Sequence, residues 1–146
     1  MAAAKKAVAG TRYYIGTTAS NGASDSYTEI TGAKQVGGDV GGTYQVVDTT
    51  DISDLVKQET KTLLDPGQAD LEMHEIVDDA GQAAIKAAFE DTGDVPYNFK
   101  VVYPTGDSRR YKAKVMSYQP MVGGANAIRM IRSRVSLTEA ATYVAA

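Results

Sequence analysis

The sequence contains no cysteine, no tryptophan and a single histidine, His74. The absence of cysteine excludes disulfides, thiolate metal sites, cysteine nucleophiles and iron–sulfur clusters. A lone histidine leaves no convincing nucleophile–base–orienter set and no plausible zinc site. His74 shares the polar face of an alternating segment with acidic residues, which favours a solvated strand residue over a general base. These absences predict a protein that is not an enzyme and that uses no metal or cofactor.

Long hydrophobic runs are missing as well. No stretch approaches the ~20 apolar residues that a membrane helix needs. The two lysines near the N-terminus are not followed by the apolar core of a signal peptide, so we expect no membrane association. The lack of cysteine also fits a protein made in a reducing cytoplasm.

The length of 146 residues and the 43% of hydrophobic residues predict one domain spanning residues 1–146. We expect a flexible N-terminal arm over about residues 1–10. Tyrosine outnumbers phenylalanine nine to two, so much of the aromatic packing must come from tyrosine. Tyrosine suits half-buried sheets and interfaces, because its ring is apolar and its hydroxyl is polar.

Charge is segregated along the chain, although the net charge is only −3. The segment 39–94 holds fourteen acidic residues and three lysines, whereas the segment 109–134 holds seven basic residues and no acid. Such a chain can be charge-complementary to copies of itself, if the two regions lie on opposed surfaces. Alternatively, the two regions neutralise each other within one fold. The sequence leaves both possibilities open.

Most of the chain has the composition and alternation of short strands. Residues rich in β-branched and aromatic side chains predict strands at 12–18, 27–30, 33–36, 43–47, 69–76, 96–103, 109–118 and 127–138. One helix is expected, with Asp79 as its N-cap, Gln82 in a capping-box position, a stripe formed by Ile85 and Phe89, and a stop at Gly93. The fold class is therefore mainly β (α+β): an antiparallel β-sandwich or rolled barrel with one flanking α-helix.

Three segments read as loops or arms. Residues 17–26 are small and polar and predict a mobile loop. Residues 48–66 predict a long loop, and loops of this length tend to be functional or disordered. Its acids Asp48, Asp51 and Asp54 recur every three residues without the spacing or the central glycine of a calcium loop, so a solvated charged loop is the better interpretation. Residues 139–146 predict a flexible C-terminal arm.

The other motifs point away from nucleotide chemistry. The glycine pairs have neither dinucleotide-binding nor Walker spacing, so turns explain them better. The alternating basic residues Arg110, Lys112 and Lys114 could grip phosphates, but aromatic residues hardly interleave them. A protein contact or an internal ion-pair role is favoured for this basic face. A small carboxylate-based hydrolase remains a remote alternative.

Several pieces, in their order and spacing, resemble the major tail tube proteins of bacteriophages with long non-contractile tails. These pieces are the early Tyr27-Thr28-Glu29-Ile30, Pro66-Gly67 followed by Leu71, Asp78-Asp79-Ala80-Gly81-Gln82, Ala87-Ala88-Phe89, a hairpin around Pro104-Thr105-Gly106, and Val115 with Ser117-Tyr118 and Pro120. The likeness covers residues 27–137. It implies the tail-tube fold.

The resemblance also implies a function and partners. Tail tube subunits are structural virion proteins that form six-fold rings sharing an inner β-barrel, and the rings stack into a tube for DNA ejection. The implied partners are further copies of the chain, the tail tip or baseplate complex, the tape-measure protein and the tail terminator. The implied location is the tail of the virion, assembled in the host cytoplasm. A single-ring tail terminator or head–tail connector, or a secretion-system tube protein of related fold, is the alternative.

The resemblance assigns candidate roles to particular residues. In relatives the long loop reaches a neighbouring subunit or ring, which here gives Asp48, Asp51, Ile52, Asp54, Leu55, Lys57, Lys61 and Leu63. A conduit must not bind its DNA, so its wall should be acidic or neutral, and we expect Asp70, Glu72 and Glu75 to face the lumen. The basic residues Arg110, Lys112, Lys114, Arg132 and Arg134 are then expected on a contact face between subunits or rings.

Overall fold

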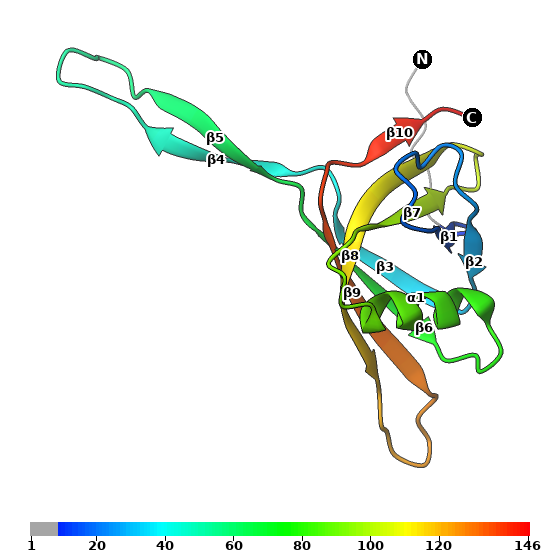
Figure 1. Ribbon diagram of the computed structural model, residues 1–146. Helices are drawn as coiled ribbons and strands as arrows, with labels where there is room; N and C mark the ends of the chain where they lie inside the picture. Colours follow the sequence, from blue (N-terminus) through cyan, green and yellow to red (C-terminus); the bar gives the residue numbers. More distant parts are fainter. Residues whose placement is uncertain (1–8) are drawn as a thin grey trace, which may run out of the picture.

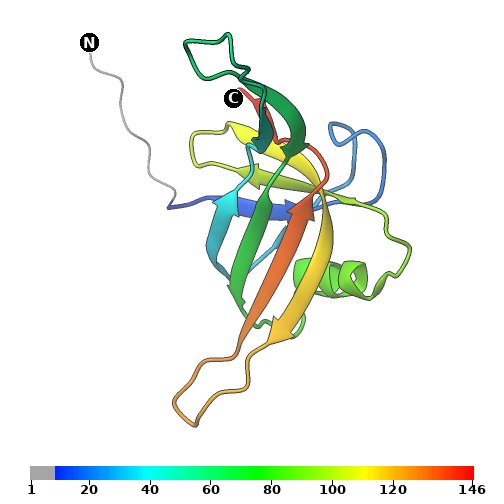
Figure 2. The same ribbon diagram turned by 90° about the vertical axis from the view of Figure 1, so that its left-hand side faces the viewer.

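The computed structural model describes residues 9–146, in which one curled antiparallel sheet carries a single helix and a projecting hairpin (Figures 1 and 2). The predicted N-terminal arm lies almost entirely outside these residues. The sheet has eight strands in the order β2-β1-β7-β8-β9-β6-β3, with β10 paired to β8. Their bounds are β1 Arg12–Ile15, β2 Thr28–Ile30, β3 Ala33–Asp39, β6 Gln68–His74, β7 Tyr97–Val102, β8 Ser108–Pro120, β9 Met130–Leu137 and β10 Thr142–Val144.

The sheet rolls into a half-barrel, which confirms the rolled-barrel form of the predicted fold class rather than two packed sheets. The pattern of β6 shows how the sequence achieves this. Ala69, Leu71 and Met73 are buried on its inner face, while Asp70 and Glu72 alternate with them on the outer face. Because side chains in a strand alternate between faces, one face of the curled sheet encloses the core and the other faces outward.

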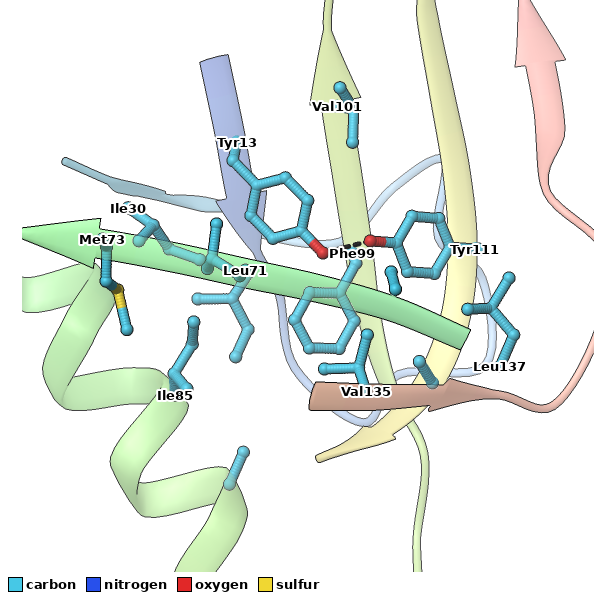
Figure 3. Close-up of a cluster of buried hydrophobic side chains, with 14 of the residues drawn as sticks. Tyr13, Ile30, Leu71, Met73, Ile85, Phe99, Val101, Tyr111, Val135 and Leu137 are labelled. Atoms are coloured by element: carbon cyan, nitrogen blue, oxygen red, sulfur yellow. Dashed lines mark hydrogen bonds between the residues drawn. The ribbon is translucent and has the colours of Figure 1, made fainter. Parts of the chain in front are cut away.

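The core lies inside the roll and depends on tyrosine, as the composition predicts. Phe99 stacks on Tyr111 with ring centroids 5.6 Å apart and contacts Tyr13 at 6.0 Å (Figure 3). The hydroxyls of Tyr13 and Tyr111 are hydrogen-bonded to each other, so neither is left unsatisfied. Burial raises the pKa of both tyrosines, which keeps the pair neutral. The aliphatic part of this core comprises Ile15, Ile30, Leu71, Met73, Ile85, Val101, Ile131, Val135 and Leu137.

The helix α1, Ala80–Glu90, begins at the predicted N-cap: the Asp79 carboxylate accepts a hydrogen bond from the Gln82 amide at 2.9 Å. The Gln82 side chain does not close a capping box. It is buried and bonds the Ile76 amide and the carbonyls of Thr31 and His74, which ties the helix to the ends of β2 and β6.

One side of the predicted apolar stripe of α1 is buried and the other is not. Ile85 and Ala88 are buried against the sheet. Phe89 remains 42% exposed, but it stacks on Tyr118 of β8 at 6.5 Å and so still contacts the sheet.

Three segments that the sequence presents as loops or arms are structured. The segment predicted as a long loop, 48–66, belongs to a hairpin of β4, Thr43–Asp48, and β5, Glu59–Asp65. Residues 139–146 include strand β10, in which Tyr143 lies opposite Arg109. The loop 17–26 is fixed to the sheet by hydrogen bonds, as described below.

We expect Gly81→Ala to lower the free energy of unfolding. A Cβ at Gly81 would lie 2.2 Å from the Glu29 carbonyl oxygen and 2.6 Å from the Ile30 Cα, both backbone atoms that cannot move aside cheaply. The clash should cost roughly 1–3 kcal/mol, despite the better helix propensity of alanine. Urea unfolding measures the change. Gly41→Ala, where nothing lies within 4 Å, is the control and should leave the midpoint unchanged.

Candidate assembly surface

Four strands of the sheet, in the order β8-β9-β6-β3, form a segment with an unpaired edge on each side. β3 pairs with β6 on one side, and the described residues provide no strand partner on its other side. β7 pairs with β8 only as far as Ala113, so residues 114–120 of β8 have β9 on one side and no described strand on the other. Each edge exposes backbone groups that can pair with another strand.

The direction of these two edge strands is fixed by the pairing between them. β8 is antiparallel to β9, β9 to β6, and β6 to β3. Three successive reversals make β3 and β8 run in opposite directions. A second copy placed beside the first with the same orientation would therefore bring its β3 antiparallel to the β8 of its neighbour.

The outer face of this segment carries both acids and bases. In the register of β6 and β9, Asp70 lies opposite Arg134 and Glu72 opposite Arg132. The Arg134 Nε donates a hydrogen bond to the Asp70 carboxylate at 2.8 Å. These side chains line a polar groove of about 720 Å³ with Gln35, Met116, Ser117 and Gln119. The acidic candidates Asp70 and Glu72 and the basic candidates Arg132 and Arg134 therefore share one face of the sheet.

The third acidic candidate, Glu75, lies beyond the end of β6. Its carboxylate binds the Arg129 Nε at 2.7 Å, and its amide donates to the Arg129 carbonyl at 3.0 Å. Acids from the 39–94 region thus pair with bases from the 109–134 region as Asp70–Arg134, Glu75–Arg129 and Asp94–Lys114. The charge segregation in the sequence is at least partly neutralised within the fold, one of the two possibilities that the sequence leaves open.

The remaining basic candidates lie on the outer face of the first half of β8. Lys112 donates to the Ser20 carbonyl at 2.6 Å, and Lys114 binds the Asp94 carboxylate at 2.9 Å. Arg110 lies opposite Lys100 of β7 and borders a small cleft with residues of the 17–26 loop. Internal contacts therefore engage Lys112 and Lys114, while a role of this face toward other subunits stays a prediction.

The 17–26 loop is fixed to this basic face by Asp25. The Asp25 carboxylate accepts hydrogen bonds from the Thr17 amide at 2.7 Å, the Thr17 hydroxyl at 2.6 Å, the Ser26 amide at 2.8 Å and the Asn98 side chain at 2.8 Å. Asn98 is itself buried and also donates to the Ala19 carbonyl. Burial opposes ionisation, but the hydrogen bonds from Thr17 and Asn98 outweigh it and lower the pKa of Asp25.

The β4–β5 hairpin, residues 41–65, projects away from the half-barrel as an arm (Figure 1). No residue of the arm is buried, although it carries many large hydrophobic side chains. A two-stranded hairpin is at best marginally stable alone in water, so such a surface needs a partner. The exposed hydrophobic residues are Tyr44, Val46, Val47, Ile52, Leu55, Val56, Leu63 and Leu64.

All of the candidate loop residues lie on this arm. Asp48, Lys61 and Leu63 belong to its strands, whereas Asp51, Ile52, Asp54, Leu55 and Lys57 form its tip. The Lys61 ammonium lies 4.9 Å from the centre of the Tyr44 ring, and Lys57 pairs with Glu59 at 3.0 Å. Sequence reasoning missed Tyr44, Val46, Val47 and Leu64 as surface residues. Both strands of the arm are rich in apolar residues, yet neither strand has a buried face. This combination could have identified the four residues as an exposed apolar surface.

The described residues offer no sign of catalytic or metal chemistry. Within residues 9–146 there is no group of three or more His, Asp or Glu side chains arranged to hold a metal ion. The Nδ1 atom of His74 is buried and has no hydrogen-bond partner there, and His74 has neither nucleophile nor orienting acid bound to it. No helix in the described part of the chain is both long and apolar enough to cross a membrane.

Comparison with known proteins defines the fold further. Neither a protein-family model nor a curated protein sequence matches this chain. Among solved structures, the sheath/tube terminator of the extracellular contractile injection system PVC is similar over 99% of this chain and 100% of its own, with a TM-score of 0.74 and 10% identity.

Two further structures show the same likeness. The SPP1 tail tube is similar over 93% of this chain and 77% of its own, with a TM-score of 0.69 and 13% identity. The tube-terminating cap of the anti-feeding prophage is similar over all of this chain and 96% of its own, with a TM-score of 0.68 and 11% identity. At these identities the likeness shows the fold, which is of the tail-tube type.

Asp25→Asn is expected to lower stability at neutral pH by roughly 1–3 kcal/mol, because it weakens four hydrogen bonds and leaves the buried Asn98 amide less well satisfied. The folded pKa lies below the unfolded value, so the charge of Asp25 contributes stability above about pH 4 that is lost as pH falls further. Urea unfolding between pH 7 and pH 3 measures both effects.

The variant should therefore show a flatter dependence of stability on pH below about pH 4 than the parent protein. Asp78→Asn changes an exposed carboxylate and is the matched control. If the pH profiles of Asp25→Asn and the parent run parallel, Asp25 is not the anchor of this loop.

Proposed function

We propose that this chain is a structural subunit that joins copies of itself into rings, and that the rings stack into the tube of a phage tail. The tube is the conduit for DNA ejection, and the chain has no enzymatic role. In this proposal the tail is of the long non-contractile class, the rings are six-fold, and the protein is a virion component assembled in the host cytoplasm. Its partners are its own copies, the tip or baseplate complex, the tape-measure protein and the terminator.

The observation that carries this proposal is the pair of open edges on the segment β8-β9-β6-β3. Because β3 and β8 run in opposite directions, rotation about an axis parallel to the strands brings the β8 edge of one copy against the β3 edge of the next in antiparallel pairing. The same contact repeats around the ring until it closes, which leaves neither of these two edges free. A closed inner barrel of shared strands is the result.

The outer face of the segment suits the wall of a DNA conduit. In such a ring this face, with Asp70, Glu72, Arg132 and Arg134, lines the lumen. Two acids and two bases cancel, and the ion pair of Asp70 with Arg134 removes a free cation from the wall. A wall without net positive charge does not retain DNA phosphates, because phosphate binding depends on unpaired Lys and Arg side chains.

The main alternative is a single-ring protein that closes the tube, either a tail terminator or a head–tail connector. Structures described as a sheath/tube terminator and as a tube-terminating cap are as similar to this chain as the tail tube is. A tube of a related secretion system is a further alternative. The exposed arm favours stacking, because a ring that ends a tube needs axial contacts on one side only.

Met116→Pro should block ring formation and leave the monomer folded. Met116 lies at a β-bulge of β8 and has no partner residue in β9, so proline there breaks no paired position of the ladder. Proline also fixes the backbone φ at position 116, which disturbs the part of β8 that is open to pairing with another copy. Electron microscopy and sedimentation at rising protein concentration should show rings or tubes for the parent and only monomers for the variant.

Met116→Ala is the matched control, because it removes the same side chain but keeps the backbone amide. It should still assemble, and circular dichroism should show all three proteins to be folded. A parent protein that stays monomeric at every concentration would overturn the proposed function. Single rings without tubes would favour the terminator alternative.

A further inference from the structure

A cavity of about 530 Å³ opens between the start of β1, the end of β7, β8 and β3. Its floor is aromatic and aliphatic, with Tyr13, Tyr111, Val101 and Val40. The volume lies in the range of sites that hold small organic groups, so it can accept more than one aliphatic side chain. The full lining adds Ala9, Gly10, Thr11, Ala33, Lys34, Gln35, Gly37, Gly38, Tyr103 and Arg109.

The charged residues of this lining are both cations. Lys34 is exposed, and Arg109 is held between the rings of Tyr103 and Tyr143, at 5.2 and 5.3 Å from their centres. Among the side chains that the structure describes, no acidic residue lines the cavity and neither cation has an ion pair. The cavity is therefore an apolar hole with a positive rim.

The tip of the arm has the complementary character. Ile52 and Leu55 are 105% and 102% exposed, so neither touches any other part of the chain. The tip is nevertheless locally ordered: the Asp51 carboxylate accepts from the Ser53 amide and hydroxyl at 2.9 and 2.5 Å, and the Asp54 carboxylate accepts from the Asp51 amide at 2.9 Å. Two aliphatic side chains thus project beside two acids.

The tip cannot reach the cavity of its own chain. Gly38 and Val40, at the root of the arm, line the cavity, whereas the tip stands at the far end of the extended hairpin (Figure 1). At about 3.3 Å per extended residue the arm is roughly 30 Å long. Any occupant of this kind must come from another molecule.

We infer that the arm tip of one copy inserts into this cavity of a second copy, with Ile52 and Leu55 against the aromatic floor and Asp51 and Asp54 beside Lys34 and Arg109. This inference rests on the proposed function, since it names the contact that joins one ring to the next. Each copy offers one tip and one cavity, so the contact is heterologous and can repeat from copy to copy. Its repetition links copies beyond those joined by the strand edges of one ring.

Cysteine cross-linking tests the contact directly, because the natural chain has no cysteine. Leu55→Cys combined with Lys34→Cys should give a ladder of disulfide-linked oligomers when assembled protein is oxidised mildly. Thr60→Cys combined with Lys34→Cys is the matched control, since Thr60 lies on the shaft of the same arm. The control pair should give at least tenfold less cross-linking.

Exchange of the two charges provides a second test of the same contact. Asp51→Lys and Lys34→Glu should each raise the protein concentration needed for tube formation at least tenfold, and the double variant should restore it toward the parent value. Both residues are exposed, so unfolding midpoints should stay unchanged in all three variants. Failure of the double variant to recover would contradict the pairing.

The outcomes separate this inference from the proposed function. If tubes form but cysteines at positions 55 and 34 do not cross-link, the proposed function stands and the tip-in-cavity contact is wrong. A ladder that appears only after deletion of residues 1–8 would mean that the chain's own N-terminal segment fills the cavity, which also overturns it. If the cysteines cross-link soluble copies that never form rings, the tip-in-cavity contact stands and the proposed tube function is wrong.

Discussion

The structure depends on one constraint: backbone amide and carbonyl groups at the edge of a β-sheet require partners. Most of the half-barrel meets this requirement internally through the ladders of its eight strands. Besides the short strands β2 and β10, the open edges in the described part of the sheet are β3 and residues 114–120 of β8, which lie at the two sides of a single four-stranded segment. Their opposite directions make them complementary to each other between copies. The open edges of the monomer thus already specify the geometry of an assembly.

The segregated charges of the sequence pair with each other across the sheet. The acids of 39–94 and the bases of 109–134 are not held apart on opposed surfaces, because β6 and β9 bring Asp70 next to Arg134 and Glu72 opposite Arg132. Exposed pairs of this kind contribute little to stability, commonly under about 1 kcal/mol. Their main effect is on the field of the outer face, which they leave close to neutral. In the described part of the chain, unpaired acids remain at the arm tip, and unpaired cations remain at the rim of the cavity.

The sequence predicted those features that depend on local pattern. The alternation around Leu71 and Met73 assigned the buried face of β6, and Asp79 marked the start of the helix. It missed β5, because a strand exposed on both faces has no pattern of burial to read. It also missed the fixed 17–26 loop, since Asp25 is anchored by Asn98, which is 73 residues away. The sequence also could not predict which residue lies opposite Asp70, because the register between strands depends on the tertiary structure.

The unsupported arm has a consequence for when assembly happens. In the separate chain, the hairpin gains no packing energy that offsets the entropy lost on ordering it, so most of that cost falls on the first contact with another copy. Copies that join later bind to a surface on which the arms are already ordered, so they do not pay this entropy cost again for those arms. Growth from an existing template is then faster than the start of a new one, which produces a lag phase and confines polymer formation to sites where a seed is present. In the proposed assembly, free subunits would therefore accumulate without polymerising prematurely.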